Sequence, residues 1–248
     1  MRTFLYQATL ATQKIIDTLQ HKDKSLYTLH QIGAGGDRSI GADLVSESIY
    51  KEYLLPLASI NSEESGFIQG ARSDYIMLDP LDGSDNFLSH IPYYGASLAL
   101  CDTNGRVKEA VIFNFCTKEG RARVEDKVIR FAIESYLQEG EAAFIALESL
   151  PLTKCGIFEK AYSNPHITAL LYQNHLKFRS LGASALSIAQ SYEVNFMLFM
   201  GNIRDFDSKA GLFLCEKLHH IRTNNFTLIS KDKHIFDMIS HIVLESKG

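Results

Sequence analysis

The sequence of 248 residues contains no tryptophan, only four cysteines and five prolines, and no strong excess of one charge. Its formal net charge of −4 gives no electrostatic case for nucleic-acid binding, which usually requires a basic surface, and we expect no nucleic-acid partner, although a local basic pocket is compatible with this charge. The cysteines are far apart and form no CxxC pair. They are Cys101, Cys116, Cys155 and Cys215. This spacing favours buried apolar packing over disulfides or a zinc site.

Long apolar runs are also missing. No stretch approaches the roughly 18 apolar residues of a membrane-spanning helix. The N-terminus lacks the charged-then-apolar pattern of a signal peptide. We therefore expect a cytoplasmic protein without a membrane partner. With 46% hydrophobic and 22% charged residues, the chain has an ordinary globular composition and is long enough to bury a core.

Hydrophobic periodicity predicts an α+β first half. The predicted elements are helices over 4–19 and 43–55, and strands over 75–78, 97–101 and 107–115. Pro56 ends the second helix, and Asn104-Gly105 is a strong hairpin signal between the last two strands. A glycine-rich turn at 33–37 could cradle a phosphate, although a plain flexible loop is the simpler interpretation.

The second half alternates strands with helices, which favours an α/β layer. The predicted elements are helices over 165–174, 183–192, 207–219 and 235–245, and strands over 177–181, 194–200 and 227–230. His219 and His220 are interpreted as a cap at the C-terminal end of a helix rather than as metal ligands. We place a domain boundary near residue 140, between halves 1–140 and 141–248, although no proline- or glycine-rich linker marks it.

The most informative stretch is Asp79-Pro80-Leu81-Asp82-Gly83-Ser84, which follows a predicted buried strand. Two carboxylates three residues apart, with a backbone carbonyl between them, suit a hard cation such as Mg²⁺. If Asp82 caps the next helix, the following amides are free to bind a phosphate at the positive end of the helix dipole. Taken alone, the same residues also describe an ordinary turn.

Two further acidic sites accompany this turn. Glu63 and Glu64 follow a short apolar run, and Asp207 stands at a predicted helix start. Each has a simpler explanation in isolation, because paired glutamates often lie in solvated loops and aspartate often caps a helix.

Together the three motifs resemble those of the inositol monophosphatase family. This family belongs to the lithium-sensitive, metal-dependent phosphatase superfamily, which also contains class I fructose-1,6-bisphosphatases. The matching motifs are Glu63-Glu64-Ser65, Asp79-Pro80-Leu81-Asp82-Gly83-Ser84 and Phe206-Asp207-Ser208-Lys209-Ala210-Gly211, with smaller echoes at Asp43-Leu44-Val45 and Arg179-Ser180-Leu181-Gly182. Their order and spacing fit over nearly the whole chain. The resemblance implies a layered αβαβα sandwich.

The resemblance also implies a two-metal phosphomonoesterase that uses Mg²⁺, with a third, weaker metal recruited in the family. By position, Glu63, Asp79 and the Leu81 carbonyl would hold one ion, and Asp79, Asp82 and Asp207 the second. Ser84, with Glu63, would orient the attacking water. Asp82 and the amides of Gly83 and Ser84 would contact the phosphate. The first half would therefore bind metal and phosphate, and the second half the rest of the substrate. A homodimer and inhibition by lithium are expected as well.

The departures from the family pattern concern the substrate. Phe206 replaces the usual tryptophan, and Asp85 stands where a small hydroxyl residue is common. The family's glutamate upstream of the last aspartate is absent from 198–205, where Arg204 is the nearest polar candidate together with Asp205. The segment Gly182-Ala183-Ser184 matches the polyol contact only in part. We therefore expect substrate contacts from Gly182, Ala183, Ser184 and Arg204.

These observations favour a phosphatase for a small phosphorylated polyol or sugar, with inositol monophosphate as the first candidate. Fructose 1,6-bisphosphate and 3′-phosphoadenosine 5′-phosphate remain alternatives. An alternative of another class is a non-catalytic regulator that binds metal or phosphate on the same scaffold.

Overall fold

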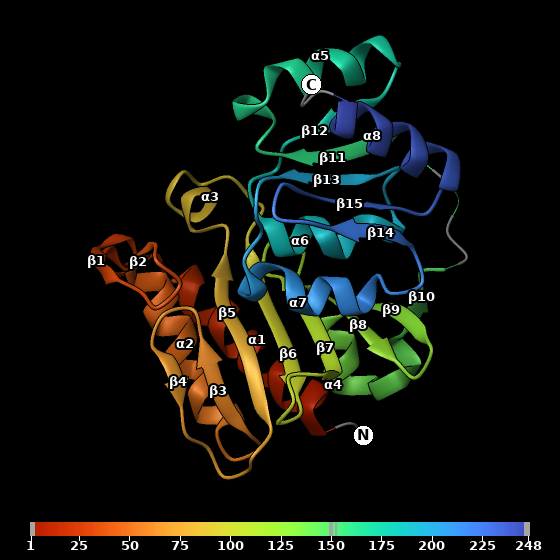
Figure 1. The fold of residues 1–248 in the computed structure, drawn as a ribbon. Helices are drawn as coiled ribbons and strands as arrows, with labels where there is room; N and C mark the ends of the chain where they lie inside the picture. Colours follow the sequence, from red (N-terminus) through yellow and green to blue (C-terminus); the bar gives the residue numbers. More distant parts are fainter. Residues whose placement is uncertain (1–2, 149–150, 152, 246–248) are drawn as a thin grey trace.

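A computed structural model describes residues 3–148, 151 and 153–245, which form five alternating layers of helices and sheets (Figure 1). The first layer contains α1 (Thr3–Gln20), α2 (Gly41–Leu54) and α4 (Ile133–Glu139). The middle layer contains α6 (Ser184–Ala189) and α7 (Asp205–Leu214), between the two large sheets. The outer layer contains α5 (Pro165–Gln173) and α8 (Lys233–Glu245). The expected αβαβα sandwich is confirmed.

The first sheet has eight strands in the order β10-β9-β8-β7-β6-β5-β3-β4. Their bounds are β3 Ser59–Ser62, β4 Gly66–Ile68, β5 Tyr75–Asp82, β6 Gly95–Cys101, β7 Val107–Asn114, β8 Glu119–Val124, β9 Lys127–Ala132 and β10 Ile145–Ala146. Neighbouring strands are antiparallel except β3 and β5, which are parallel. A short helix, α3 (Ser84–Leu88), follows β5 directly.

The second sheet has five strands in the order β12-β11-β13-β15-β14. Their bounds are β11 Cys155–Glu159, β12 Lys177–Arg179, β13 Met197–Met200, β14 His219–Arg222 and β15 Phe226–Ser230. A separate hairpin joins β1 (Leu29–Ile32) to β2 (Arg38–Ile40), and single 3₁₀ turns lie at 24–27, 140–143, 161–163 and 190–192.

Strand β13 shows why the sheets must be covered on both faces. Met197 and Phe199 pack in the core around α6 and α7, whereas Leu198 and Met200 pack in the core beneath α5 and α8. Successive side chains of a strand point to opposite faces, so a continuous apolar run needs an apolar layer on each side. One buried apolar cluster lies between the first helical layer and the first sheet, one surrounds α6 and α7 between the two sheets, and one lies between the second sheet and the outer helices.

The predicted helices and strands are all present, with ends that differ by a few residues, but several elements were missed. Strands β8 and β9 carry arginines and a glutamate among their apolar residues, which weakens the alternation that predicts a strand. The interpretation of His219 and His220 as a helix cap is wrong, because α7 ends at Leu214 and both histidines lie in β14.

The chain passes from the first sheet to the second between Ala146 and Cys155, which lies after the predicted boundary at residue 140. Strand β10 still pairs with β9 in the first sheet, while α6 and α7 pack against both sheets. The division into two domains stays a prediction. Among the described residues, no helix is long and apolar enough to cross a membrane.

Candidate active site

The parallel pair β3 and β5 brings the first two site carboxylates together. Ser62, the last residue of β3, pairs with Leu78 in register, so Glu63 lies just past β3 beside Asp79, which is still within β5. The Glu63 amide donates to the Leu78 carbonyl at 2.9 Å, which ties the end of β3 to β5. The parallel pairing thus places the two acids next to each other.

Helix α7 adds the third carboxylate. Asp207 lies in its first turn and is 6% exposed, and α7 packs across the sheet that carries Glu63 and Asp79. One carboxylate oxygen from each of Glu63, Asp79 and Asp207 lies within 4.8 Å of the others. Three buried oxygen donors at this separation fit a hard divalent cation such as Mg²⁺.

Burial raises the pKa of each acid in this group. Burial and then the charges of Glu63 and Asp82 raise the pKa of Asp79 well above its usual range. Burial likewise raises the pKa of Glu63 to about 7, although the guanidinium of Arg204 opposes the rise. Burial raises the pKa of Asp207 against the same opposing guanidinium. Without a cation the group therefore holds protons more tightly than isolated carboxylates, so it is built to receive positive charge.

Arg204 provides part of that charge. Its Nη1 atom lies 2.6 Å from Glu63 Oε1 and 2.8 Å from Asp37 Oδ2, and its Nε lies 3.0 Å from Asp207 Oδ2. The side chain is about one-third exposed (37%). The sequence predicted a substrate contact here. The structure instead places the guanidinium among the acids, and a substrate contact stays a prediction.

The motif 79–84 forms a local irregularity at the end of β5. The register with β6 shifts between Asp79 and Asp82, and the Leu81 amide donates to Asp79 Oδ1 at 3.0 Å. Gly83 then adopts φ +94°, where a Cβ would lie 3.0 Å from the Tyr93 carbonyl oxygen. The position therefore needs glycine on both counts, and α3 starts immediately afterwards.

Asp82 does not join the group of three acids. Its two carboxylate oxygens accept hydrogen bonds from the amides of Ser184 and Leu186 at 2.9 and 3.0 Å, at the start of α6. Burial and the nearby charge of Asp207 raise its pKa well above the usual range, so it still lies within reach of the cluster's charge. Its expected part in a second metal site stays a prediction.

Ser84 has a partner that the sequence alone did not assign. Its hydroxyl lies 2.8 Å from Asp43 Oδ1 and 3.0 Å from the Leu81 carbonyl oxygen. Asp43 is buried in the first turn of α2 and also accepts the Ile40 amide at 2.6 Å. Burial raises the pKa of Asp43 to about 7. Its first-turn position was visible in the sequence, but the long-range contact with Ser84 was not.

The glycine-rich turn at 33–37 is hydrogen-bonded to the backbone of Glu63 and Glu64. The amides of Ala34 and Gly35 donate to the carbonyls of Glu64 and Glu63 at 3.0 and 2.7 Å, so they are not available to a phosphate. A Cβ at Gly35 would lie 2.4 Å from the Glu63 side chain. The turn therefore supports Glu63, and these amides do not form a phosphate cradle.

The predicted substrate segment 182–184 lies on the opposite wall of the site. Gly182 adopts φ +85°, and its amide donates to Glu159 Oε2 at 3.0 Å. Ala183 is buried beside Gly83, and Ser184 lines the cleft. Sequence analysis missed Glu159, a buried acid at the end of β11 that also accepts the Ser187 hydroxyl at 2.5 Å.

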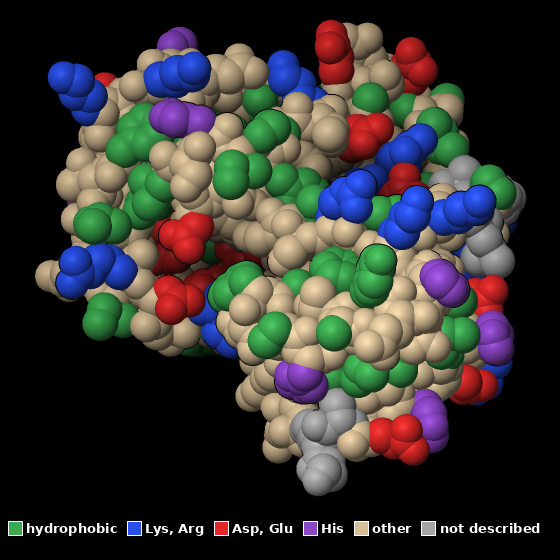
Figure 2. All heavy atoms as spheres, turned by 90° about the horizontal axis from the view of Figure 1, so that it is seen from above, with side chains coloured by type: hydrophobic (Ala, Val, Ile, Leu, Met, Phe, Trp, Pro, Cys, Tyr) green, Lys and Arg blue, Asp and Glu red, His purple; other side chains and the backbone are tan. Residues whose placement is uncertain are grey.

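These elements enclose one cleft of about 610 Å³. Acids from the first half line it, and residues of both halves form its walls. Figure 2 shows carboxylate side chains gathered around a hollow on this side of the molecule. Asp85 lies exposed at the cleft, so its charge is solvated. Of the predicted site residues, only Ala183 lies behind the lining. The lining members are Glu63, Asp79, Leu81, Asp82, Gly83, Ser84, Gly182, Ser184, Arg204 and Asp207.

Sequence comparison places this chain beside known phosphatases. The model of the inositol monophosphatase family matches residues 37–218. The Nus factor SuhB of Escherichia coli is 27% identical over 149 residues, which cover 59% of this chain and 54% of that protein. The inositol-1-monophosphatase of Rhizobium meliloti is 33% identical over 109 residues, which cover 40% of this chain and 41% of that protein. The matches thus span about half the length of these curated relatives, or less.

Solved structures agree on the fold. The extragenic suppressor protein suhB of Bartonella henselae aligns with a TM-score of 0.73 at 17% identity, covering 96% of this chain and 98% of that chain. The fructose-1,6-bisphosphatase of Leishmania major aligns with a TM-score of 0.76 at 13% identity, covering 97% and 93%. At these identities the likeness shows the layered architecture alone.

Proposed function

This chain belongs to the inositol monophosphatase family, and on that premise we propose that it is a Mg²⁺-dependent phosphomonoesterase for a small phosphorylated polyol or sugar. Inositol monophosphate is the first candidate substrate. The observation that carries the proposal is the meeting of Glu63, Asp79 and Asp207 within 4.8 Å, beside a serine hydroxyl that is bonded to a buried aspartate.

In this proposal Glu63, Asp79 and Asp207 hold the metal, with Asp82 and the Leu81 carbonyl as the further ligands that the family resemblance implies. When bound, Mg²⁺ supplies positive charge that offsets the charge of the phosphate and of the leaving oxygen. Two ions per chain, with a weaker third, follow the family pattern. The buried acids fit this role because nothing else among the described residues neutralises them except Arg204.

The protein's own groups handle water and phosphate. The Ser84 hydroxyl donates to Asp43, so its lone pairs can accept a proton from an attacking water that Glu63 also orients. Because the pKa of Asp43 is about 7, this carboxylate can take up the proton that Ser84 passes on near neutral pH. The first amides of a helix lack partners within it, so those of Gly83 and Ser84 are placed to bind phosphate oxygens.

Phosphate release from purified protein, measured with Mg²⁺ and with a chelator, tests the proposal. Asp79→Asn should abolish turnover, and Ser84→Ala should lower kcat by about 10²-fold, since it removes the proton acceptor. Asp17→Asn, an exposed acid on α1, is the matched control and should keep full activity. Activity that persists in chelator, or in Asp79→Asn, would refute the metal mechanism.

A substrate panel tests the finer assignment. Inositol 1-phosphate, fructose 1,6-bisphosphate and 3′-phosphoadenosine 5′-phosphate are compared by kcat/KM. Turnover that is equally slow on all three would contradict any narrow assignment. Li⁺ should inhibit, as the family resemblance implies. We also propose a homodimer, which sedimentation analysis would detect as twice the chain mass of 27.8 kDa.

A second candidate is a non-catalytic regulator, which the name of the Escherichia coli relative favours. A regulator of this kind has no need for the Ser84–Asp43 pair, and this pair supports catalysis instead. The absence of phosphate release across a wide metabolite panel, together with Mg²⁺ binding, would favour the regulator.

A further inference from the structure

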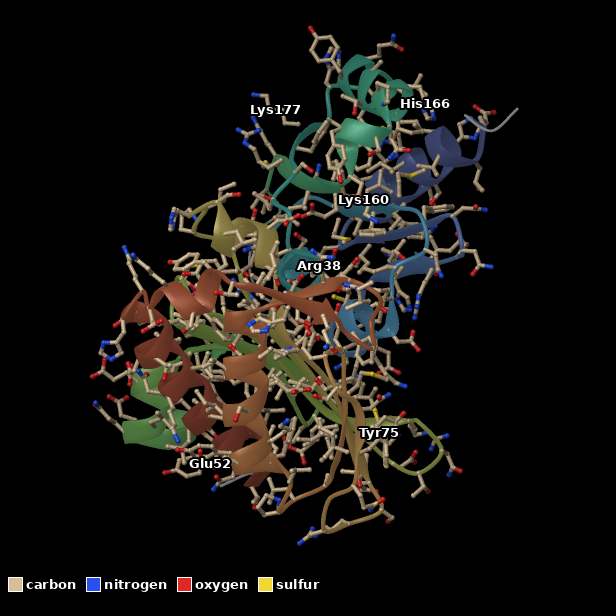
Figure 3. All side chains as sticks on the ribbon, turned by 90° about the vertical axis from the view of Figure 1, so that its left-hand side faces the viewer. Arg38, Glu52, Tyr75, Lys160, His166 and Lys177 are labelled. Carbon is tan, nitrogen blue, oxygen red and sulfur yellow. The ribbon has the colours of Figure 1, made fainter. Side chains whose placement is uncertain are left out.

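Three cationic side chains line the cleft, and they differ in their surroundings. Arg204 is neutralised by Glu63, Asp207 and Asp37. Arg38 and Lys160 line the same cleft but form no ion pair with any residue that the structure describes. Figure 3 shows Arg38 on the N-terminal half, with Lys160 above it on the C-terminal half. Two cations without acid partners thus remain beside a cleft whose floor is acidic.

Lys160 has an unusual backbone conformation. It follows β11 directly and adopts φ +60° and ψ +28°, in the left-handed region. A residue with a Cβ pays about 1–2 kcal/mol to adopt this conformation, which glycine and asparagine adopt more readily.

The conformation holds the lysine side chain over the cleft wall. Glu159 and Phe199 are register partners in β11 and β13, so the residue after Glu159 lies beside the Phe199 ring. The Lys160 ammonium lies 4.7 Å from the centroid of that ring. Phe199 is buried and lines the cleft with Gly182 and Ser184. A cation over an aromatic face is attracted to it, which limits the positions of an otherwise flexible side chain.

Lys160 lines the same cleft as the three buried acids. A cation that is positioned but unpaired is suited to bind an anion that enters with the substrate. The reacting phosphate itself belongs at the floor, next to Ser84. An anion near Lys160 would therefore be a different group of the same substrate.

We infer that Lys160 determines specificity by binding a second anionic group, a phosphate or a carboxylate, on the substrate of this phosphatase. Arg38 assists from the facing half of the cleft. The inference rests on the proposed phosphatase function and refines it. A monophosphate of a neutral polyol would leave the Lys160 ammonium without a partner, whereas a substrate with a second anion would pair with it.

Selectivity between substrates tests this inference. Fructose 1,6-bisphosphate carries a second phosphate, 2-phosphoglycerate carries a carboxylate, and inositol 1-phosphate carries neither. Lys160→Met keeps the length and the apolar contact with Phe199 but removes the charge. We expect the ratio of kcat/KM for the better of the two substrates with a second anionic group to kcat/KM for inositol 1-phosphate to fall at least tenfold, mainly through KM. Of those two substrates, the one that loses more identifies the second group.

Two further variants separate charge from folding. Lys160→Arg should retain most of the selectivity, because it keeps the cation. Lys160→Gly relieves the backbone strain and should lose selectivity as Lys160→Met does. Lys177→Met is the matched control, since Lys177 is an exposed lysine on β12 outside the cleft lining, and it should leave the ratio unchanged (Figure 3). A Lys160→Met ratio within twofold of the parent protein would overturn the inference.

Failure of the phosphatase proposal would look different. The parent protein would then release no phosphate from any of the three compounds in Mg²⁺. In that case, binding of fructose 1,6-bisphosphate and 2-phosphoglycerate would be measured by calorimetry in Mg²⁺. At least tenfold weaker binding of either compound by Lys160→Met would still support the anion site. Equal binding by both proteins, or no binding by the parent protein, would refute it.

Discussion

Replacing Arg204 by glutamine removes the only cation that the structure places among the site's buried acids. The guanidinium lies 2.6 Å from Glu63, 2.8 Å from Asp37 and 3.0 Å from Asp207. Removing one partner of a fully buried pair costs about 3–5 kcal/mol, and of an exposed pair at most about 1 kcal/mol. With 37% exposure, Arg204 lies between these limits, so we expect a loss of about 2 kcal/mol in the absence of metal.

Bound Mg²⁺ should reverse most of this loss, because it neutralises the same carboxylates. We expect Arg204→Gln to cost less than about 1 kcal/mol in saturating Mg²⁺, where metal charge replaces guanidinium charge. Thermodynamic linkage then requires the variant to bind Mg²⁺ more tightly, by about the difference, or roughly tenfold in Kd. On this reasoning Arg204 is a counter-ion of Glu63 and Asp207, and we predict that it competes with Mg²⁺ for them.

Urea denaturation at pH 7.5, with chelator and with Mg²⁺, measures both free energies of unfolding. Calorimetric Mg²⁺ titration measures the affinity directly. Arg222→Gln is the matched control, since Arg222 has similar exposure and pairs with Asp205 outside the cluster, at 2.8 Å. Its cost should not depend on Mg²⁺. Equal losses for Arg204→Gln with and without Mg²⁺, or weaker metal binding by this variant, would refute the reasoning.

Two further predictions concern pH and backbone conformation. The folded-state pKa of Glu63 is raised to about 7 from a usual 4.5, so its stabilising contribution is complete below pH 4.5 and is lost as pH rises through 7. In chelator the free energy of unfolding should therefore fall by about 3 kcal/mol for this group between pH 4.5 and 8, as urea titrations at several pH values would measure. A rise in stability over this range would contradict the assignment, and Glu63→Gln should flatten the fall. Gly83→Ala should lower the melting temperature more than Gly36→Ala. Both positions have φ near +95°, but only at Gly83 would a Cβ meet neighbouring atoms, and equal losses would show that the close packing is unimportant.

Local sequence predicted the turn at 79–84 and the helices around it. Proline and glycine restrict the backbone at 79–84 by steric rules that operate within a few residues, so an irregular turn after a buried strand was predictable, although β5 continues to Asp82. The helical spacing of apolar residues in 4–19 likewise predicted a helix, and the apolar run around Met197 to Met200 predicted a strand. The layered fold was predicted from the resemblance of the three motifs to those of a known family. This prediction was possible because the order and spacing of the motifs can be read from the sequence.

Tertiary structure alone decided the partners of each charged group. Asp43 meets Ser84 across 41 positions, and Arg204 meets Glu63 across more than a hundred. Sequence periodicity does not reveal such contacts, because they arise from the packing of α2 and α7 near the place where β3 ends beside β5. Strands in which charged residues interrupt the alternation of apolar and polar side chains, such as β8, were missed for a related reason. Pairing with the neighbouring strands stabilises them, and their own sequence pattern does not show this pairing.

The turn at 33–37 and the residue Lys160 show the same division. The glycines at 33–37 were visible in the sequence, but only the folded chain shows that their amides bind the backbone of Glu63 and Glu64. Lys160 carried no signal in the sequence, because a left-handed backbone at a lysine depends on the strand before it and the aromatic ring beside it. The amino-acid sequence by itself therefore indicated which residues are candidates for the site. The tertiary structure decided which of them meet, because charge and hydrogen bonding act over distances in space that chain separation does not reveal.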